Sequence, residues 1–499
     1  MKTRIMHPLD APPTPPPPTV SVSRKVSPYR RTLTLRGQPV LGVRRRGITA
    51  TALPANHILT ILGYGATVNG VASDPYAIRD PTGSDLYVDF SAGSDGTGTL
   101  ASPWKTLSIA RVQSVSPGQQ LVGRNSTGNW PDMTSSQDGT SANHIVVRSY
   151  PGETCTFTQA ADGAAQGGGD YWDFYRIAIS CLNTGIKMSD PGENTYANYV
   201  RWIDCTGTRS SNSVTDNSAI LYFYGTGSQI SQGHEVIRGT FTGVNPGSPG
   251  LSNASLLFFN TGVNCKIIGC LLDGSYCPVY FKHAYSLYYG PSTPWGTVKN
   301  NIIRNGARGF MAAANYVTYS NNVFDNCGLD LSESGGGDRS GGNHCTLSHN
   351  THFRPTSGYL TSALGMYSTE GNTYWREFNR LSDNVFSTTS TDYSDNPYSI
   401  NGTGGTTDWD NDIDYSAVSG ASTPLYYRNG STYTMAAYKA AYPTQEVNGE
   451  AGTVTFVGGA GGGGTTPANW ALAGGSIGKN NGSDGTDRGV DSSKLLTVN

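Results

Sequence analysis

An irregular repeat in the central part of the chain constrains its fold more than any other feature. Each unit is a short apolar strand pattern that ends in a pair of small or polar residues, before another apolar pair begins. These pairs are Asp204-Cys205, Arg238-Gly239, Gly269-Cys270, Asn300-Asn301, Asn321-Asn322, His349-Asn350 and Asp383-Asn384. Subtracting the numbers of their second residues gives steps of 34, 31, 31, 21, 28 and 34 residues. Such a quasi-repeat is typical of one supersecondary unit that stacks many times.

Stacking is required because one unit buries only one face of a short strand and cannot fold alone. When units stack, like residues lie over like, and their apolar side chains form a continuous core. Asparagine at the bend tolerates left-handed backbone angles, and stacked side-chain amides can hydrogen-bond along the stack. The repeat therefore predicts an all-β solenoid, a single-stranded right-handed parallel β-helix, from about Asp85 to about Asp491.

The composition agrees with this prediction. The chain has 499 residues with 64 Gly, 29 Tyr and 14 Phe, and only 14% of its residues are charged. Many turns, few charges and many aromatics favour strands over helical bundles. We expect helix only in short pieces, such as Tyr433 to Ala441.

The texture of the sequence divides the chain into four parts. Residues 1–21 are predicted to be a Pro-rich extended arm, and residues 22–84 a small β-rich anchoring region with short apolar alternations. Residues 85–492 are predicted to form the β-helix, including divergent C-terminal coils, and residues 493–499 a tail.

Charge is distributed unevenly along the chain. Residues 1–50 contain ten Lys and Arg against the single Asp10, which gives +9, and the remaining 24 basic and 35 acidic residues give −11. A basic arm in front of a mildly acidic body indicates that the arm has a partner of its own. That partner is an acidic protein surface or nucleic acid. The Pro-rich composition favours protein, and we expect no nucleic-acid partner.

Eight cysteines are present, and none of them forms a CxxC pair with zinc spacing. Several lie inside apolar strand patterns, so we expect free thiols packed inside the coil. The N-terminus has no apolar segment of a signal peptide, and no stretch is long and apolar enough to cross a membrane. We therefore expect synthesis in the host cytoplasm without classical export, and no membrane insertion.

Several stretches resemble the pectate-lyase-like right-handed parallel β-helix family. They are Tyr87 to Leu107, Gly139 to Arg148 with its Pro151-Gly152-Glu153 turn, the repeated Asn-Asn-Ile and Asn-Asn-Val units, Asp412 to Tyr415, Gln445-Glu446, Phe456-Val457, Trp470 to Leu472, Gly475 to Gly478 and Asp487 to Asp491. The resemblance implies the fold. It does not choose a function, because this fold carries lyases, hydrolases and non-catalytic fibres.

The layout of a short anchor in front of a β-helix resembles bacteriophage tailspikes. That resemblance implies a homotrimer in the virion tail, attached to tail or portal-region proteins through residues 1–84. It also implies that the helix binds, and often cleaves, a host surface polysaccharide. Two alternatives stay open: a free polysaccharide lyase or glycoside hydrolase, and a non-catalytic structural fibre or capsid-surface protein.

Hydrolysis of a glycan needs two carboxylates that flank the scissile bond, roughly 5 to 9.5 Å apart depending on the mechanism. Asp330, Glu333 and Asp338 lie in a Gly-rich excursion between two units and are the predicted catalytic residues. The alternative is a solvated acidic loop. Glu370 and Glu377 near Trp375 form a second candidate, predicted to bind substrate.

A lyase instead needs a base, an acid and a group that neutralises the uronate charge. Lys282 and His283 end a strand pattern and Arg304 follows one short unit later, so they are the lyase alternative, although no acidic metal-ligand cluster precedes Lys282. Tyr285, Tyr288 and Trp295 are predicted to stack on sugars. His344, His349 and His352 alternate along strands and cannot share one metal. We expect neither a metal nor a cofactor.

Overall fold

The computed structural model describes the chain in part. The described residues are 74–498 except 134–136, 160–164, 168, 189–196, 211–217, 225–230, 245–254, 261, 285–294, 307–309, 332–343, 355–361, 366–378, 389–395, 401–411, 420–425, 429–430 and 460–461, together with four two-residue strands before residue 73. Residues up to Ala77 form one unit, and residues from Ile78 onward form the other.

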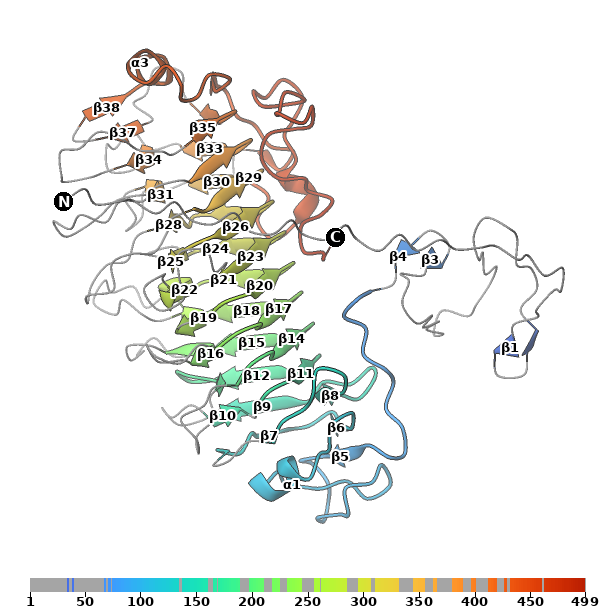
Figure 1. Ribbon diagram of the computed structural model, residues 1–499. Helices are drawn as coiled ribbons and strands as arrows, with labels where there is room; N and C mark the ends of the chain where they lie inside the picture. The colour runs from blue at the N-terminus through green and yellow to red at the C-terminus, as the bar shows by residue number, and fades with distance from the viewer. Residues whose placement is uncertain are drawn as a thin grey trace, which may run out of the picture. The chain divides into compact units, whose positions relative to one another are not determined.

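Strands roughly one repeat apart in sequence pair in parallel, and the chain winds through three long sheets in turn (Figure 1). Sheet 1 contains β10 (Ala165–Gly167), β13 (Ile186–Met188), β16 (Ala219–Tyr224), β19 (Ser255–Asn260), β22 (Cys277–Ala284), β25 (Phe310–Ala314), β28 (Leu329–Asp330), β31 (Ser362–Gly365), β34 (Asn396–Ile400), β37 (Tyr426–Arg428) and the antiparallel β38 (Ser431–Tyr433).

Sheets 2 and 3 have the same parallel order. Sheet 2 contains β5 (Leu86–Val88), β6 (Gln120–Gly123), β8 (Ile145–Ser149), β11 (Trp172–Tyr175), β14 (Arg201–Ile203), β17 (Glu235–Ile237), β20 (Cys265–Ile268), β23 (Gly296–Lys299), β26 (Val317–Ser320), β29 (Thr346–Ser348), β32 (Arg380–Ser382) and β35 (Asp412–Asp414). Sheet 3 contains β7 (Thr127–Asn129), β9 (Thr156–Gln159), β12 (Ala178–Cys181), β15 (Thr206–Arg209), β18 (Thr240–Gly243), β21 (Leu271–Asp273), β24 (Ile302–Arg304), β27 (Val323–Asp325), β30 (Thr351–Arg354), β33 (Val385–Thr388), β36 (Ala417–Ser419) and β39 (Glu450–Gly452). The predicted all-β parallel β-helix is confirmed.

Helices are few and short in the described part. They are α1 (Ile109–Gln113), α3 (Met435–Ala441) and the 3-10 helix η3 (Pro467–Trp470), and α3 confirms the helix expected near Ala441. The Thr434 side chain accepts a hydrogen bond from the main-chain N–H of Ala437 and so caps α3. None of the described helices has the length and apolar character needed to span a membrane.

The N-terminal unit is described only through two antiparallel strand pairs. The first joins β1 (Thr34–Leu35) to β2 (Gln38–Pro39), and the second joins β3 (Thr67–Val68) to β4 (Val71–Ala72). The Pro-rich arm of residues 1–21 and most of the anchoring region lie outside the described residues, so both stay predictions.

The small polar pairs of the repeat form the corner between sheet 2 and sheet 3. From β14 onward, two residues suffice to turn from one sheet into the other. The first residue of each pair adopts a positive φ: 69° for Gly269, and between 51° and 61° for Asp204, Arg238, Asn300, Asn321, His349 and Asp383. Asparagine, aspartate and glycine tolerate this left-handed region best, which explains why they recur there.

The second residue of four successive pairs builds an amide ladder, defined as Asn301, Asn322, Asn350 and Asn384. Each side-chain N–H donates to the side-chain oxygen of the next member, over 2.8 Å, 3.0 Å and 3.0 Å in turn. That oxygen also accepts the main-chain N–H of the preceding member, as in Asn322 to Asn350 at 3.0 Å. The four side chains are fully buried, so these bonds satisfy amides that have no contact with water.

The ladder ends on a carboxylate. Glu446 lies above Ser416, whose main-chain N–H donates to its Oε2 at 3.2 Å, while the Tyr426 hydroxyl donates to its Oε1 at 2.9 Å. Burial raises the pKa of Glu446, which is fully buried. Below the ladder, Cys205 and Cys270 occupy the same corner position, and their thiols donate to main-chain carbonyls.

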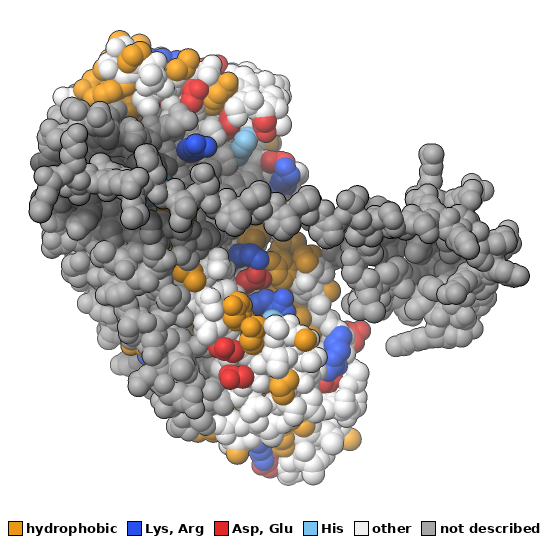
Figure 2. All heavy atoms as spheres, viewed as in Figure 1, with side chains coloured by type: hydrophobic (Ala, Val, Ile, Leu, Met, Phe, Trp, Pro, Cys, Tyr) orange, Lys and Arg blue, Asp and Glu red, His pale blue; other side chains and the backbone are white. Residues whose placement is uncertain are grey.

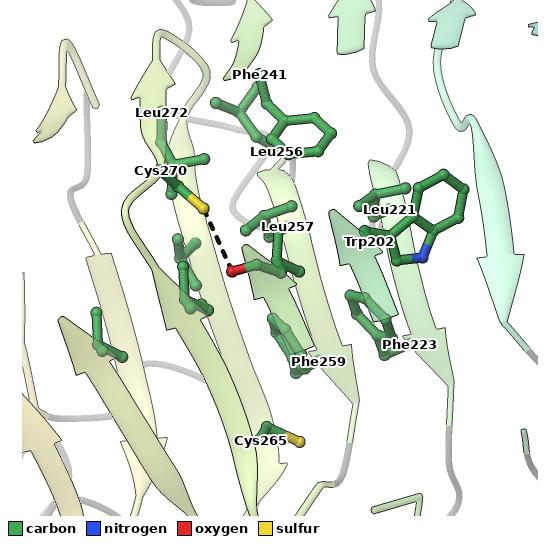
Figure 3. Packing of buried hydrophobic residues seen from close by; sticks show 14 of the residues in the cluster. Trp202, Leu221, Phe223, Phe241, Leu256, Leu257, Phe259, Cys265, Cys270 and Leu272 are labelled. Carbon is green, nitrogen blue, oxygen red and sulfur yellow. Dashed lines mark hydrogen bonds between the residues drawn. The ribbon is translucent and has the colours of Figure 1, made fainter. Parts of the chain in front are cut away.

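The interior is filled by like side chains that stack from one coil to the next (Figure 3). The Phe174 and Trp202 rings stack with centroids 3.9 Å apart, and Phe223 and Phe259 stack at 4.4 Å. His352 also points inward, where its ring lies between Phe324 and Phe386. All eight cysteines are free and buried, which confirms the expectation of packed thiols.

The C-terminal stretch differs from the predicted divergent coils. After β39, residues 453–459 and 462–498 add no strand to the three sheets and instead lie along the outer face of sheet 3 (Figure 1, red). Outward apolar residues of that sheet create the need for a cover. The packed cluster comprises Ile302, Val323, Phe353, Val385 and Ala417 of sheet 3 with Val454, Phe456, Trp470, Leu472, Val490 and Leu495 of the cover.

Corner residues hold this cover in place. The Leu496 N–H donates to the Asn300 carbonyl at 2.8 Å, and the Asp491 N–H donates to Asn321 Oδ1 at 2.5 Å. Asp383 accepts from the Ser483 N–H at 2.6 Å. The same left-handed positions that turn the chain therefore also fasten its C-terminal stretch.

We predict that Asn350→Ala destabilises the protein by about 3 kcal/mol, because it leaves several buried ladder partners without a hydrogen bond. The free energy of unfolding in urea measures this loss. Thr318→Ala, at an exposed position of β26, is the control and should change stability by less than about 0.5 kcal/mol. Equal effects of the two substitutions would contradict a structural role for the ladder.

Candidate functional site

Sheet 1 is the sheet whose strands are flanked by the long connections. The corner from sheet 2 to sheet 3 takes two residues, whereas β15 ends at Arg209 and β16 begins at Ala219. The next connection, from β16 to β17, runs from Tyr224 to Glu235. Connections that vary in length around a rigid scaffold are where binding residues concentrate. We therefore looked first at the outer face of sheet 1.

An aromatic row crosses this face from strand to strand. Lys187 of β13 is in register with Tyr222 of β16, which pairs with Phe258 of β19 and then with Tyr280 of β22. The main-chain register continues through Met311 of β25 to Asp330 of β28. We call Lys187, Tyr222, Phe258 and Tyr280 the aromatic row. Parallel pairing places its members about 4.8 Å apart along the helix axis.

The aromatic side chains of this row touch one another. The ring centroids of Tyr222 and Phe258 are 4.5 Å apart, and those of Phe258 and Tyr280 are 5.2 Å apart. Phe258 and Tyr280 are buried, whereas Tyr222 and Lys187 are partly exposed. With Tyr276, Cys277 and Ala219 they form a cluster separate from the interior core.

A second, shorter row lies beside the first. Tyr224 is in register with Asn260, which is in register with Lys282 of β22. The Tyr224 and Tyr222 rings meet edge to face at 5.7 Å. Tyr224 and Asn260 are partly exposed, so this edge of the face offers an aromatic ring and an amide to solvent.

Lys187 supplies the positive charge of the described face. Its Nζ lies 3.9 Å from the Tyr224 ring centroid and 5.6 Å from that of Tyr222. Among the described residues, no carboxylate lies within ion-pair distance of Lys187. Burial lowers the pKa of Lys187 and raises that of Tyr222. The face thus combines aromatic surface, neutral phenol groups and one cation held by cation–π contact.

Elsewhere on the surface, charges are mostly paired. Asp173 pairs with Arg201 at 2.5 Å, and Glu235 pairs with Lys266 at 2.6 Å, on neighbouring strands of sheet 2. On the face seen in Figure 2, acidic and basic side chains lie beside one another rather than gathering by sign. The lysine of sheet 1 differs from this pattern because rings, not carboxylates, surround it.

The predicted hydrolytic residues are only partly described. The main chain of Asp330 lies in β28 of sheet 1, paired with Met311 and Gly365, so it continues the aromatic row. The remaining predicted catalytic and substrate-binding residues of these loops lie outside the described residues: Glu333, Asp338, Glu370, Trp375, Glu377, Tyr285 and Tyr288. Their roles stay predictions.

The expected meeting of Lys282 and Arg304 is wrong. Lys282 and His283 belong to β22 of sheet 1, whereas Arg304 belongs to β24 of sheet 3. Arg304 Nε lies 3.3 Å from Asp325 Oδ2 and 4.0 Å from Asp273 Oδ1. Burial raises the pKa of Asp325 to about 6. The error arose because strands that follow one another in sequence belong to different sheets in this fold.

Trp295 was also wrongly predicted as a sugar-stacking residue. It is buried, and its ring packs on Phe281 at 3.7 Å and on Phe259 at 5.3 Å inside the coil. Its neighbour Gly296 begins β23, so the tryptophan occupies the last inward position of the preceding turn. The chain brings Trp295 to the core of the coil rather than to the outer face of sheet 1.

The three histidines occupy three different surroundings. His344 stacks on Tyr316, His349 lies 3.5 Å from Asp484, and His352 lies in the interior. Across the part of the chain that the structure describes, no three metal-binding side chains converge.

Sequence reasoning missed the most accessible residues of the site, Lys187, Tyr222 and Tyr224. Tyr222 and Tyr224 stand in Leu221-Tyr222-Phe223-Tyr224, where both faces of the strand are apolar. A strand with two apolar faces reads as buried, so the outward tyrosines were indistinguishable from core residues. The hydroxyl on every second residue was the available signal.

Comparisons with known proteins give only distant likenesses. No family profile and no curated protein sequence matches the chain. Among solved structures, an alginate lyase from Paenibacillus sp. str. FPU-7 has a TM-score of 0.39 at 14% identity, covering 69% of this chain and 94% of that one. Pectate lyase Pel9A has 0.33 at 13% (62% and 78% covered), and PfbA, a surface adhesin of Streptococcus pneumoniae, has 0.34 at 12% (62% and 72% covered). These values carry no argument about function.

Proposed function

We propose that this protein binds a polysaccharide along the outer face of sheet 1, with the aromatic row and Tyr224 as its contact surface. The observation that carries the proposal is the unbroken register from Lys187 through Tyr222 and Phe258 to Tyr280. Sugars present apolar C–H faces and hydroxyl edges. Aromatic rings with phenol groups match both, because each ring has an apolar body and a polar tip.

The geometry favours a chain-like ligand over a compact one. Members of the row repeat at one strand spacing, so the contact surface extends along the helix axis and can follow several sugar units. The body has a net charge of −11 after residue 50, obtained from 24 basic and 35 acidic residues, which disfavours nucleic acid as the extended ligand.

Depolymerisation of that polysaccharide is the finer proposal. The main chain of Asp330 continues the aromatic row, and Glu333 and Asp338 follow within eight residues of the same Gly-rich stretch. A carboxylate at the end of an aromatic contact surface would meet a bound glycan. Hydrolysis is favoured over elimination because Lys282 and Arg304 lie in different sheets.

Attachment to a virion is proposed from the sequence of the N-terminal region. The +9 charge of residues 1–50 and the proline run fit an extended arm that binds an acidic protein surface. In this proposal the protein is a homotrimeric, tailspike-like receptor-binding protein of a virion tail. A free enzyme and a non-catalytic fibre are the alternatives that the following experiments separate.

We predict that Tyr222→Ala and Tyr224→Ala each weaken polysaccharide binding about 5- to 30-fold, corresponding to about 1–2 kcal/mol per lost ring contact. A panel of uronic and neutral polysaccharides in affinity electrophoresis first identifies a ligand, and titration then measures the variants. Tyr150→Ala is the matched control, because Tyr150 is a partly exposed tyrosine near the opposite corner and should leave binding unchanged. Unchanged binding in both sheet 1 variants would disprove the proposed face.

We predict that Asp330→Asn lowers the rate of depolymerisation about 10²- to 10⁴-fold while binding is retained, because a general acid or base is lost. Release of reducing ends reports hydrolysis, and ultraviolet absorbance of unsaturated ends reports elimination. Asp273→Asn on sheet 3 is the matched control. If the parent protein cuts no polysaccharide that it binds, the fibre alternative replaces catalysis.

We predict that the full chain has a mass of about 159 kDa in light scattering, three times its 52.9 kDa, as a homotrimer requires. We also expect reversal of Arg44, Arg45 and Arg46 to Glu to prevent incorporation into particles, because it removes positive charge from the arm. A monomeric protein whose incorporation does not depend on these arginines would exclude the tailspike proposal. Polysaccharide binding at sheet 1 would be unaffected by that result.

A further inference from the structure

A buried arginine without a counter-ion lies at the corner between sheet 3 and sheet 1. Arg209 ends β15, and only 2% of it is exposed. Its Nη1 donates to the Ser255 carbonyl at 2.8 Å, and its Nη2 donates to the Ser275 hydroxyl at 2.6 Å. Both acceptors are neutral, so neither offsets the charge of the guanidinium.

The guanidinium also has an unused donor. Its Nε is buried and has no hydrogen-bond partner, and no carboxylate of the described residues forms an ion pair with it. Burial lowers the pKa of Arg209 to about 10, which leaves it charged at neutral pH. A buried cation is ordinarily paired, because removing an unpaired charge from water costs several kcal/mol.

Another buried arginine shows the usual solution. Arg488 is equally buried, and its three nitrogens donate to the carbonyls of Asn481, Ser416 and Asn448. Its Nη2 also lies 3.5 Å from Glu450. Arg209 has neither a complete set of acceptors nor a carboxylate, so its surroundings are incomplete by comparison.

A second unused donor lies in the same corner. Ser218, just before β16, is 1% exposed, and its hydroxyl has no hydrogen-bond partner among the described residues. Its carbonyl accepts the N–H of Ser255 at 2.9 Å, and Ser255 is the residue whose own carbonyl accepts from Arg209. Cys181, on the adjacent strand β12, offers no negative charge, because burial raises the pKa of its thiol to about 12.

We propose that a small monovalent anion of the chloride class binds in this corner, between Arg209 Nε and the Ser218 hydroxyl. Two donors and one uncompensated positive charge define the chemistry of the ligand. A monoatomic anion accepts both hydrogen bonds and brings no donor that would need an acceptor of its own. It also neutralises the buried charge without a side chain.

The anion would fasten the strands that carry the aromatic row. Arg209 belongs to β15, Ser218 and Ser255 lie at the start of β16 and β19, and Ser275 precedes β22. Those three sheet 1 strands bear Tyr222, Phe258 and Tyr280. The inference concerns the support of this face and holds whether or not the face binds a polysaccharide.

Bromide tests the site directly. Crystals of the full chain grown with sodium bromide, measured at the bromine absorption edge, should show anomalous density within hydrogen-bond distance of Arg209 Nε and Ser218 Oγ. Absence of such density at high bromide concentration would overturn the proposal.

Solution measurements give an independent check. The midpoint of thermal unfolding should rise with chloride relative to gluconate at equal ionic strength, and Arg209→Met should abolish that difference. Ser218→Ala removes one donor and should weaken the apparent chloride affinity about tenfold, which keeps the test valid if Arg209→Met fails to fold. Arg124→Met, which removes the partly exposed arginine paired with Glu153, should retain the full chloride response. A chloride response that is unchanged in Ser218→Ala would contradict the site.

Discussion

The hydrogen-bonded corner between sheet 2 and sheet 3 is the constraint on which the rest of the molecule depends. A two-residue turn with one left-handed residue leaves no freedom in the register of the strands on either side. The amide ladder then ties each turn to the next through buried bonds of about 3 Å. Because neighbouring turns are locked at one corner, the other two corners can vary in length without shifting the stack.

This division of labour explains where a binding face can form. Sheet 2 carries paired charges, and the outer face of sheet 3 is partly covered by the C-terminal stretch. Sheet 1 has the variable connections at its strand ends and an aromatic row across its strands. A rigid support fixes the spacing of the rings, so little conformational entropy is lost when a repeating ligand binds. The buried Arg209 extends the same logic, since it joins the strands beneath that row.

Residue types at the corner made the fold predictable. Asn300-Asn301 and Asn321-Asn322 announced both the left-handed bend and the stacked amides, because asparagine is suited to each role. The helix near Ala441 and the buried thiols followed from similar local rules. These features depend on a few neighbouring residues, which a single sequence displays directly.

Features that depend on distant residues were not predictable. The C-terminal stretch reads like further coils, and only the outward Val323 and Val385 require it to act as a cover. Lys282 and Arg304 are close in sequence, yet the winding of the chain sends them to different sheets. Trp295 and Tyr222 look equally apolar in the sequence, and which of them faces the core is decided by register alone.

A structure of the protein with a bound oligosaccharide tests the functional account most directly. The account predicts density for the sugar chain over the outer face of sheet 1, running along the helix axis with sugar rings against Tyr222 and Tyr224. Density for the sugar on sheet 2 or sheet 3, with sheet 1 unoccupied at saturating ligand, would contradict it.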